Sequence, residues 1–85
     1  MNREYFAKRL KELRKLHGET QKDLANAVFV SETSIQNYEY MLHLPTVEIL
    51  CSIALHYGVS IDSLLFENRK TVDDRLLEIR KLTYM

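Results

Sequence analysis

Apolar residues recur at intervals of three and four along most of this 85-residue chain, the spacing that places side chains on one face of an α-helix. Leu24, Ala25 and Val28 form one such stripe, and Ile35 and Tyr38 form another. No alternating apolar and polar run of useful length predicts a β-strand. We therefore predict an all-α fold whose first five helices span Arg3 to His17, Gln21 to Ala27, Ser31 to Tyr40, Thr46 to Tyr57 and Ile61 to Phe66.

A sixth helix is predicted over Val72 to Leu82, after the polar stretch Glu67 to Thr71. Its apolar residues, among them Leu76 and Ile79, follow one helical face and charged residues surround them. The chain is thus expected to contain a helical domain over residues 1–68 and an amphipathic C-terminal helix within residues 69–85. That helix either packs on the fourth and fifth helices or pairs with a second copy, which would make the protein a homodimer.

Local signals at the predicted helix ends support these boundaries. Thr20 followed by Asp23 is typical of a capping box, and Ser31 is placed to cap the next helix. Gly18 and Gly58 stand just beyond the first and fourth helices, where a left-handed residue often ends a helix. The caps predicted for the last two helices of the domain are Thr46, preceded by Pro45, and Ser60.

The second and third helices are short, and the turn between them is too tight for anything except a sharply angled pair. While Ile35 and Tyr38 face inward, the opposite face of the third helix carries Glu32, Thr33, Gln36 and Asn37. Such side chains can donate to or accept from base edges in the major groove of DNA, with Glu32 suited to cytosine and Gln36 or Asn37 suited to adenine. The alternative is a helix face that is polar because it is solvated.

A wider set of residues favours the first interpretation. The set comprises Phe6, Leu10, Leu13, Arg14, Gly18, Thr20, Gln21, Leu24, Ala25, Val30, Ser31, Ile35, Tyr38, Glu39, Pro45, Leu50, Ile53, Ala54, Gly58, Val59 and Ser60. With these residues, positions 4 to 66 resemble the Cro/phage-repressor (XRE-like) type of helix-turn-helix domain. The resemblance implies a five-helix lambda-repressor-like fold, sequence-specific binding to a double-stranded DNA operator, and a role as a bacterial or phage transcriptional regulator.

The resemblance also implies roles for residues outside the base-reading face. Arg14 of the first helix and Glu39 near the end of the third are expected to form an ion pair that fixes the orientation of the two helices; the alternative is that each is solvated separately. Uncharged groups can hold DNA phosphates through backbone amides and polar side chains. The residues expected to do so here are Gln21, Ser31, Tyr40 and His43.

Three departures from the family pattern bear on that function. Phe29 stands where the turn usually has glycine. The turn can tolerate a side chain there if the residue leaves the positive-φ region, a change that could shift the angle between the two helices. Glu19 stands where the family usually has an apolar core residue. The loop after the third helix usually carries a glycine and cations, but here it is Met41 to Leu44, Met-Leu-His-Leu.

The charge distribution is the main objection to DNA binding, because phosphate affinity comes largely from Lys and Arg. The chain has 12 cationic and 12 acidic residues. Six cations and two acids give residues 1–18 a net charge of +4, and one cation with four acids gives residues 19–45 a net charge of −3. The predicted third helix contains no cation.

A second class of function therefore stays open, an antitoxin-like or anti-repressor module that uses the same fold to bind another protein. Four apolar residues are expected in one neighbourhood that could form such a surface: Phe29, Met41, Leu42 and Leu44. The alternative is that several of them fold back into the core. Salt-dependent binding to duplex DNA would separate the two functions.

Composition excludes several other classes. The chain has no apolar run near the length of a membrane span and no signal-peptide core, so we expect a cytoplasmic protein without a membrane partner. The single cysteine, Cys51, lies in an apolar run and is expected to be buried. His17, His43 and His56 are scattered, and His56 suits a helix C-terminus. These observations predict neither an enzyme nor any metal or cofactor.

Overall fold

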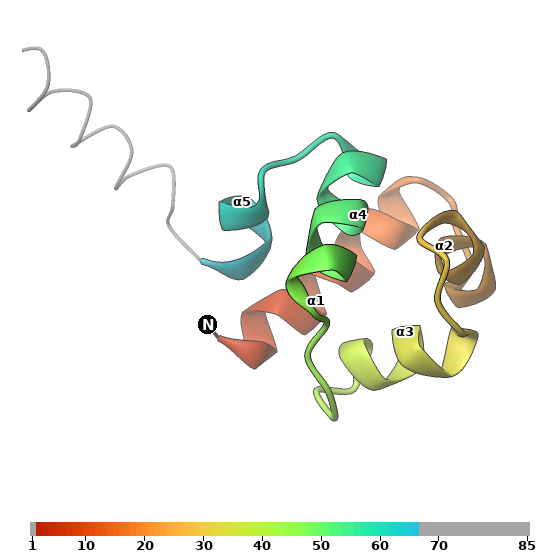
Figure 1. The fold of residues 1–85 in the computed structure, drawn as a ribbon, viewed down its shortest axis with the longest axis horizontal. Helices are drawn as coiled ribbons and strands as arrows, with labels where there is room; N and C mark the ends of the chain where they lie inside the picture. Colours follow the sequence, from red (N-terminus) through yellow and green to blue (C-terminus); the bar gives the residue numbers. More distant parts are fainter. Residues whose placement is uncertain (1, 67–85) are drawn as a thin grey trace, which may run out of the picture.

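The computed structural model describes residues 2–66, which form five helices and no strand (Figure 1). The helices are α1 (Arg3–Leu16), α2 (Gln21–Ala27), α3 (Glu32–Glu39), α4 (Val47–Tyr57) and α5 (Ile61–Leu65). The all-α prediction is confirmed, and each predicted helix begins and ends within one residue of the observed one. The sixth helix predicted over residues 72–82 and the boundary predicted after residue 68 lie outside the described residues.

Side-chain caps explain where the helices begin. At α2 the capping box is complete, because the Asp23 backbone N–H donates to Thr20 Oγ1 at 3.0 Å and the Thr20 N–H donates to Asp23 Oδ2 at 2.9 Å. The Thr20 backbone N–H lowers the pKa of Asp23 by stabilising its carboxylate. The predicted caps Ser31, Thr46 and Ser60 all accept from the third backbone N–H after them, and so does Asn2 at the start of α1, which the sequence reasoning missed.

Two glycines lie at helix ends in the left-handed conformation, as predicted. Gly18, with φ +67°, follows α1, and Gly58, with φ +66°, follows α4. At Gly58 the backbone N–H donates to the carbonyl of Leu55, so the tight end of α4 satisfies one of its terminal carbonyls.

The core lies between the five helices, and Figure 1 shows α1 behind α4 with α3 along the lower edge. Its fully buried large side chains come from all five helices: Phe6, Leu10, Leu24, Ile35, Ile53 and Leu64. Tyr5 of α1 also donates its hydroxyl to the carbonyl of Ser63 in α5 at 3.0 Å. This packing leaves the outer face of α3 free. Among the described helices, none is long and apolar enough to cross a membrane.

Candidate nucleic-acid interface

The short helix α3 presents one buried and one polar face. Ile35 is fully buried, and Tyr38 is buried with its ring against Phe6 of α1, the two ring centroids being 6.5 Å apart. On the other side, the structure places all four predicted base-reading residues at the surface, with Glu32 and Thr33 exposed and Gln36 and Asn37 half-exposed. Within the described residues none of these four side chains forms a hydrogen bond or ion pair with the protein. Their polar atoms are thus available to a ligand.

The four residues predicted to position phosphates are not gathered at one point. Gln21 lies by the carboxyl end of α3, where its side-chain amide donates to Glu39 Oε1 at 3.3 Å. Tyr40 follows α3 there and is 61% exposed, and His43 is exposed in the next loop. Ser31 lies at the opposite end of α3, where its hydroxyl accepts the backbone N–H of Ser34. All four residues are at least partly exposed. The side chains of Gln21 and Ser31, however, already form hydrogen bonds within the domain.

Arg14 and Glu39 join α1 to the end of α3. The guanidinium contacts the carboxylate twice, with Nε 2.7 Å from Oε2 and Nη2 3.1 Å from Oε1. Arg14 Nη1 also donates to the backbone carbonyl of Glu19 at 2.8 Å. The hydrogen bond to Glu39 raises the pKa of Arg14. Since the Glu39 side chain is only 2% exposed, this pair fixes the carboxyl end of α3 against α1 in one orientation.

Glu19, in the loop between α1 and α2, is the centre of a second polar cluster that the sequence reasoning missed. Its carboxylate accepts the hydroxyl of Tyr57 at 2.7 Å and lies 2.6 Å from His56 Nε2, both at the end of α4. Burial and the hydrogen bond to Glu19 raise the pKa of Tyr57, and the His17 ring lies against the same tyrosine, 4.9 Å between centroids. His56 is in the last turn of α4 as predicted, and it also pairs with Glu19.

Phe29 does not leave the positive-φ region. Its φ is +59°, and Met41 at the other end of α3 has φ +64°. The Val30 N–H donates to the Ala25 carbonyl at 3.0 Å, so the turn keeps the closed end that a glycine would give, with a phenylalanine in its place. The ring of Phe29 is 93% exposed.

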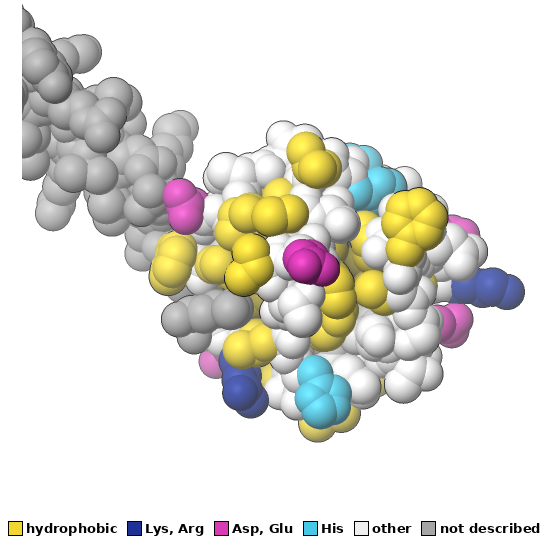
Figure 2. All heavy atoms as spheres, viewed as in Figure 1, with side chains coloured by type: hydrophobic (Ala, Val, Ile, Leu, Met, Phe, Trp, Pro, Cys, Tyr) yellow, Lys and Arg dark blue, Asp and Glu magenta, His cyan; other side chains and the backbone are white. Residues whose placement is uncertain are grey.

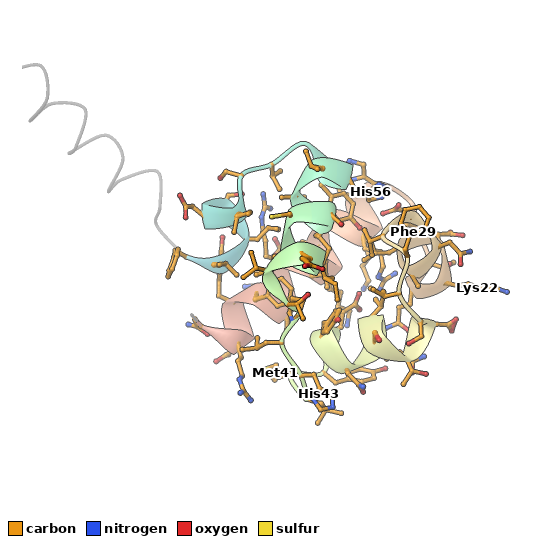
Figure 3. All side chains as sticks on the ribbon, viewed as in Figure 1. Lys22, Phe29, Met41, His43 and His56 are labelled. Carbon is orange, nitrogen blue, oxygen red and sulfur yellow. The ribbon has the colours of Figure 1, made fainter. Side chains whose placement is uncertain are left out.

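The four apolar residues expected in one neighbourhood do not form one surface. Leu44 packs against the core, whereas Met41 and Leu42 are exposed. Figure 3 shows Phe29 and Met41 at opposite ends of α3. Phe29 precedes this helix and Met41 follows it, and the eight helical residues between them are about 12 Å long. His43 lies beside Met41 in the same view.

Cys51 is also not where we expected it. It is half-buried rather than buried, because the core-facing side of α4 is filled by Leu50, Ile53, Ala54 and Tyr57, and Cys51 falls beside that stripe. Over residues 2–66, no group of three or more His, Cys, Asp or Glu side chains could hold a metal ion.

Comparison with known proteins defines the class of this domain. A family model described as helix-turn-helix matches residues 10–64, which is well over half of the chain. The chain therefore belongs to the XRE-type helix-turn-helix family, whose members are transcription regulators. No curated protein matches it.

Solved structures show the same fold. A hypothetical transcription factor, NHTF, from Neisseria is similar with a TM-score of 0.72 and 20% identity, over 84% of this chain and 82% of that one. The clp gene regulator ClgR from Corynebacterium glutamicum has a TM-score of 0.69 and 23% identity, over 96% and 87% of the two chains. The SinR/SinI protein complex contains a chain with a TM-score of 0.69 and 23% identity, over 94% and 79%.

Proposed function

We propose that this protein binds double-stranded DNA sequence-specifically as a transcriptional regulator and reads its operator with α3. The observation that carries the proposal is the outer face of α3, where four polar side chains with no partner in the described protein lie opposite a fully anchored apolar face. A helix about 12 Å long fits the major groove, and Glu32, Thr33, Gln36 and Asn37 have the donors and acceptors that read base edges there.

Rigid support of α3 adds to this proposal. Base readout requires that side chains return to the same positions in each binding event, because misplacement weakens bidentate hydrogen bonds. Ile35 and Tyr38 hold the middle of α3 in the core, and the Arg14–Glu39 pair holds its carboxyl end. Contacts with DNA phosphates would set the register of the helix in the groove. We propose that Ser31, Tyr40 and His43 make these contacts, together with the amide hydrogen of Gln21 that is not donated to Glu39.

We further propose that the protein acts as a homodimer. One module of this size with few cations in residues 19–45 gains little phosphate affinity, and two linked modules that bind half-sites about 34 Å apart gain affinity by avidity. The similar NHTF and ClgR structures are of a hypothetical transcription factor and a gene regulator, which is in keeping with the proposed regulatory function.

Enrichment of bound duplexes from a random pool tests the proposal. The expected result is a short preferred sequence, with two half-sites one helical turn apart. A variant with both Gln36→Ala and Asn37→Ala should enrich a different or weaker preference, whereas Asn26→Ala, an exposed change in α2, should enrich the same sequence. A pool that stays random with the unmodified protein would contradict sequence-specific binding.

Protein binding is the second candidate function, and the exposure of Phe29, Met41 and Leu42 favours it. A left-handed backbone at a phenylalanine costs stability through strain, and the exposed ring of Phe29 gains no burial that would offset this cost. The similar SinR/SinI structure is a complex of two proteins, which is in keeping with a protein partner on this fold. If the folded, unmodified protein binds no duplex DNA at any salt concentration, the result would favour this second function.

A further inference from the structure

Glu19 connects the end of α4 with the end of α3 through both its side chain and its backbone. Its carboxylate accepts the Tyr57 hydroxyl at 2.7 Å and lies 2.6 Å from His56 Nε2, so the loop after α1 is attached to the last turn of α4. Its backbone carbonyl accepts Arg14 Nη1 at 2.8 Å, and its N–H donates to the Arg14 carbonyl at 2.9 Å. Arg14 in turn contacts the carboxylate of Glu39 at the end of α3. These contacts form a continuous path from α4 to the proposed reading helix.

Most of this path is shielded from water. The side chain of Glu19 is 15% exposed, and those of Arg14 and Glu39 are 11% and 2% exposed. Only its outer end reaches the surface, because Figure 2 shows histidine side chains by the end of α4, where Figure 3 labels His56. Hydrogen bonds to charged groups are stronger at low exposure, and an unpaired charge is costly there. The position of each of these groups therefore depends on the groups that it contacts.

We propose that Glu19 is a positioning residue for base reading by α3, an inference that rests on the proposed function. With the Glu19 carboxylate attached to α4, the Glu19 carbonyl holds Nη1 of Arg14 and fixes the plane of the guanidinium. The other two contacting nitrogens, Nε and Nη2, are thereby directed at the Glu39 carboxylate. Arg14 and Glu39 hold the carboxyl end of α3, and Glu19 determines where that contact lies.

Asn37 is the base-reading residue most sensitive to this arrangement. It lies in the last turn of α3, two residues before Glu39, whereas Glu32 lies in the first turn, which the Ser31 side chain caps. Paired hydrogen bonds to a base require side chains placed within about 0.5 Å. Loosening the contacts of Glu19 should therefore relax base reading at the carboxyl end of α3 and spare its amino end.

NMR spectra of the full chain test the positioning without DNA, at a temperature well below the unfolding midpoint of each variant. Glu19→Ala should shift the Arg14 Nε–H resonance, and should shift the backbone amides of residues 37–40 more than those of residues 32–34. Tyr5→Phe is the matched control, because it removes the hydrogen bond from α1 to the Ser63 carbonyl and should leave both sets of resonances in place. An Arg14 resonance that does not move, or equal changes at the two ends of α3, would overturn the proposal.

Affinities for a preferred and a scrambled duplex test the consequence for base reading, again with every variant folded. Glu19→Ala should weaken binding to the preferred duplex by about threefold to tenfold and to the scrambled duplex by less than about twofold. It should relax the preference at the same base pair as Asn37→Ala. Tyr5→Phe, a substitution that affects stability alone, should change neither affinity. Equal losses on the two duplexes, or a relaxed preference at a different base pair, would overturn the proposal.

Two further variants test whether the carboxylate acts through α4. Glu19→Gln keeps an acceptor for the Tyr57 hydroxyl and should recover most of the preference that Glu19→Ala loses. Tyr57→Phe added to Glu19→Ala should weaken binding no further, because both substitutions remove the same contact; Tyr57→Phe alone repeats the test if Glu19→Ala fails to fold. Additive losses would overturn the path through α4. If the unmodified protein prefers no duplex, the proposed function fails, and the NMR comparison still decides whether Glu19 positions α3.

Discussion

Phe29 combines two unfavourable properties at one position. Its backbone has φ +59°, where a side chain costs about 1 to 2 kcal/mol, and its ring has almost no packing to offset that cost. The turn between α2 and α3 is therefore strained at a residue whose side chain contributes little to the folded domain. Retaining such a residue is consistent with a role in contact with another molecule.

Phe29→Gly is expected to stabilise the domain by about 1 kcal/mol, the relieved strain less the larger conformational entropy of glycine in the unfolded chain. The free energy of unfolding in urea measures it. Phe29→Ala is the matched control, because it removes the ring but keeps Cβ, and it should stay within about 0.5 kcal/mol of the unmodified protein. Equal stabilisation by both substitutions would place the cost in the exposed ring instead of the backbone.

Tyr57 gives the domain a predicted response to alkali. Burial, with the hydrogen bond to Glu19, raises the pKa of this tyrosine above its ordinary value of 10.0. The unfolded chain therefore ionises Tyr57 first. Stability from this group is fully present below about pH 10 and is lost as the pH rises toward the folded-state pKa.

Tyr57→Phe should remove that part of the pH dependence. The variant is expected to lose about 1.5 to 3 kcal/mol near pH 7, because a hydrogen bond to a carboxylate is broken, and to lose less of its remaining stability than the unmodified protein between about pH 9.5 and 11. Thermal unfolding across this range measures both effects. Parallel pH profiles would mean that Tyr57 titrates alike in the folded and unfolded states.

At the scale of the helices, the Arg14–Glu39 pair is the link between the scaffold and the proposed reading helix. Glu39→Ala would leave the Arg14 guanidinium, which is 11% exposed, without its carboxylate partner. We expect a loss of about 3 to 5 kcal/mol in the free energy of unfolding. Glu12→Ala is the control, because it removes the exposed Arg9–Glu12 pair, 3.7 Å apart, and should cost less than about 1 kcal/mol. If adding Arg14→Met to Glu39→Ala recovers nothing, the loss does not come from the unpaired cation.

Helix boundaries could be predicted from the sequence because their causes are local. Thr20 and Asp23 lie three residues apart, and a glycine follows each of α1 and α4, so neighbouring residues alone determine where the chain turns. The Glu19 cluster could not be predicted in this way. Its contacts join residues 37 and 38 positions apart, and only the packing of α4 against the loop after α1 brings them together.

The candidate site shows the same division. The polar face of α3 follows from the spacing of Ile35 and Tyr38 within one helix. The exposure of Phe29 and of Cys51 depends on which apolar side chains occupy the limited volume of the core. The sequence pattern does not show which of several neighbouring apolar residues will do so. Leu44 illustrates this, since it packs on the core while the neighbouring Leu42 is exposed.

For the whole molecule, the distribution of charge predicts how DNA affinity should depend on salt. The net charge is zero, and residues 19–45, which include both helices of the motif, carry only Lys22 as a cation. Few phosphates are then neutralised on binding, so log affinity should fall shallowly with log salt concentration.

Leu42→Lys should steepen that slope by about one unit, because Leu42 is exposed in the loop after α3 and a cation there would meet the backbone of bound DNA. Leu16→Lys adds the same charge on α1 and should change the slope much less. Fluorescence anisotropy with one duplex over a series of salt concentrations measures both. A steep slope in the unmodified protein would show that the cations of α1 already contact phosphates.

The central claim is that α3 reads base sequence, and the affinities of Gln36→Ala and Asn37→Ala for preferred and scrambled duplexes test it most directly. We predict that each substitution weakens binding to the preferred duplex by about 1 to 3 kcal/mol, relaxes the preference at one base pair, and leaves binding to the scrambled duplex nearly unchanged. Equal losses on the two duplexes would contradict the claim, because they would show that neither side chain distinguishes one base from another.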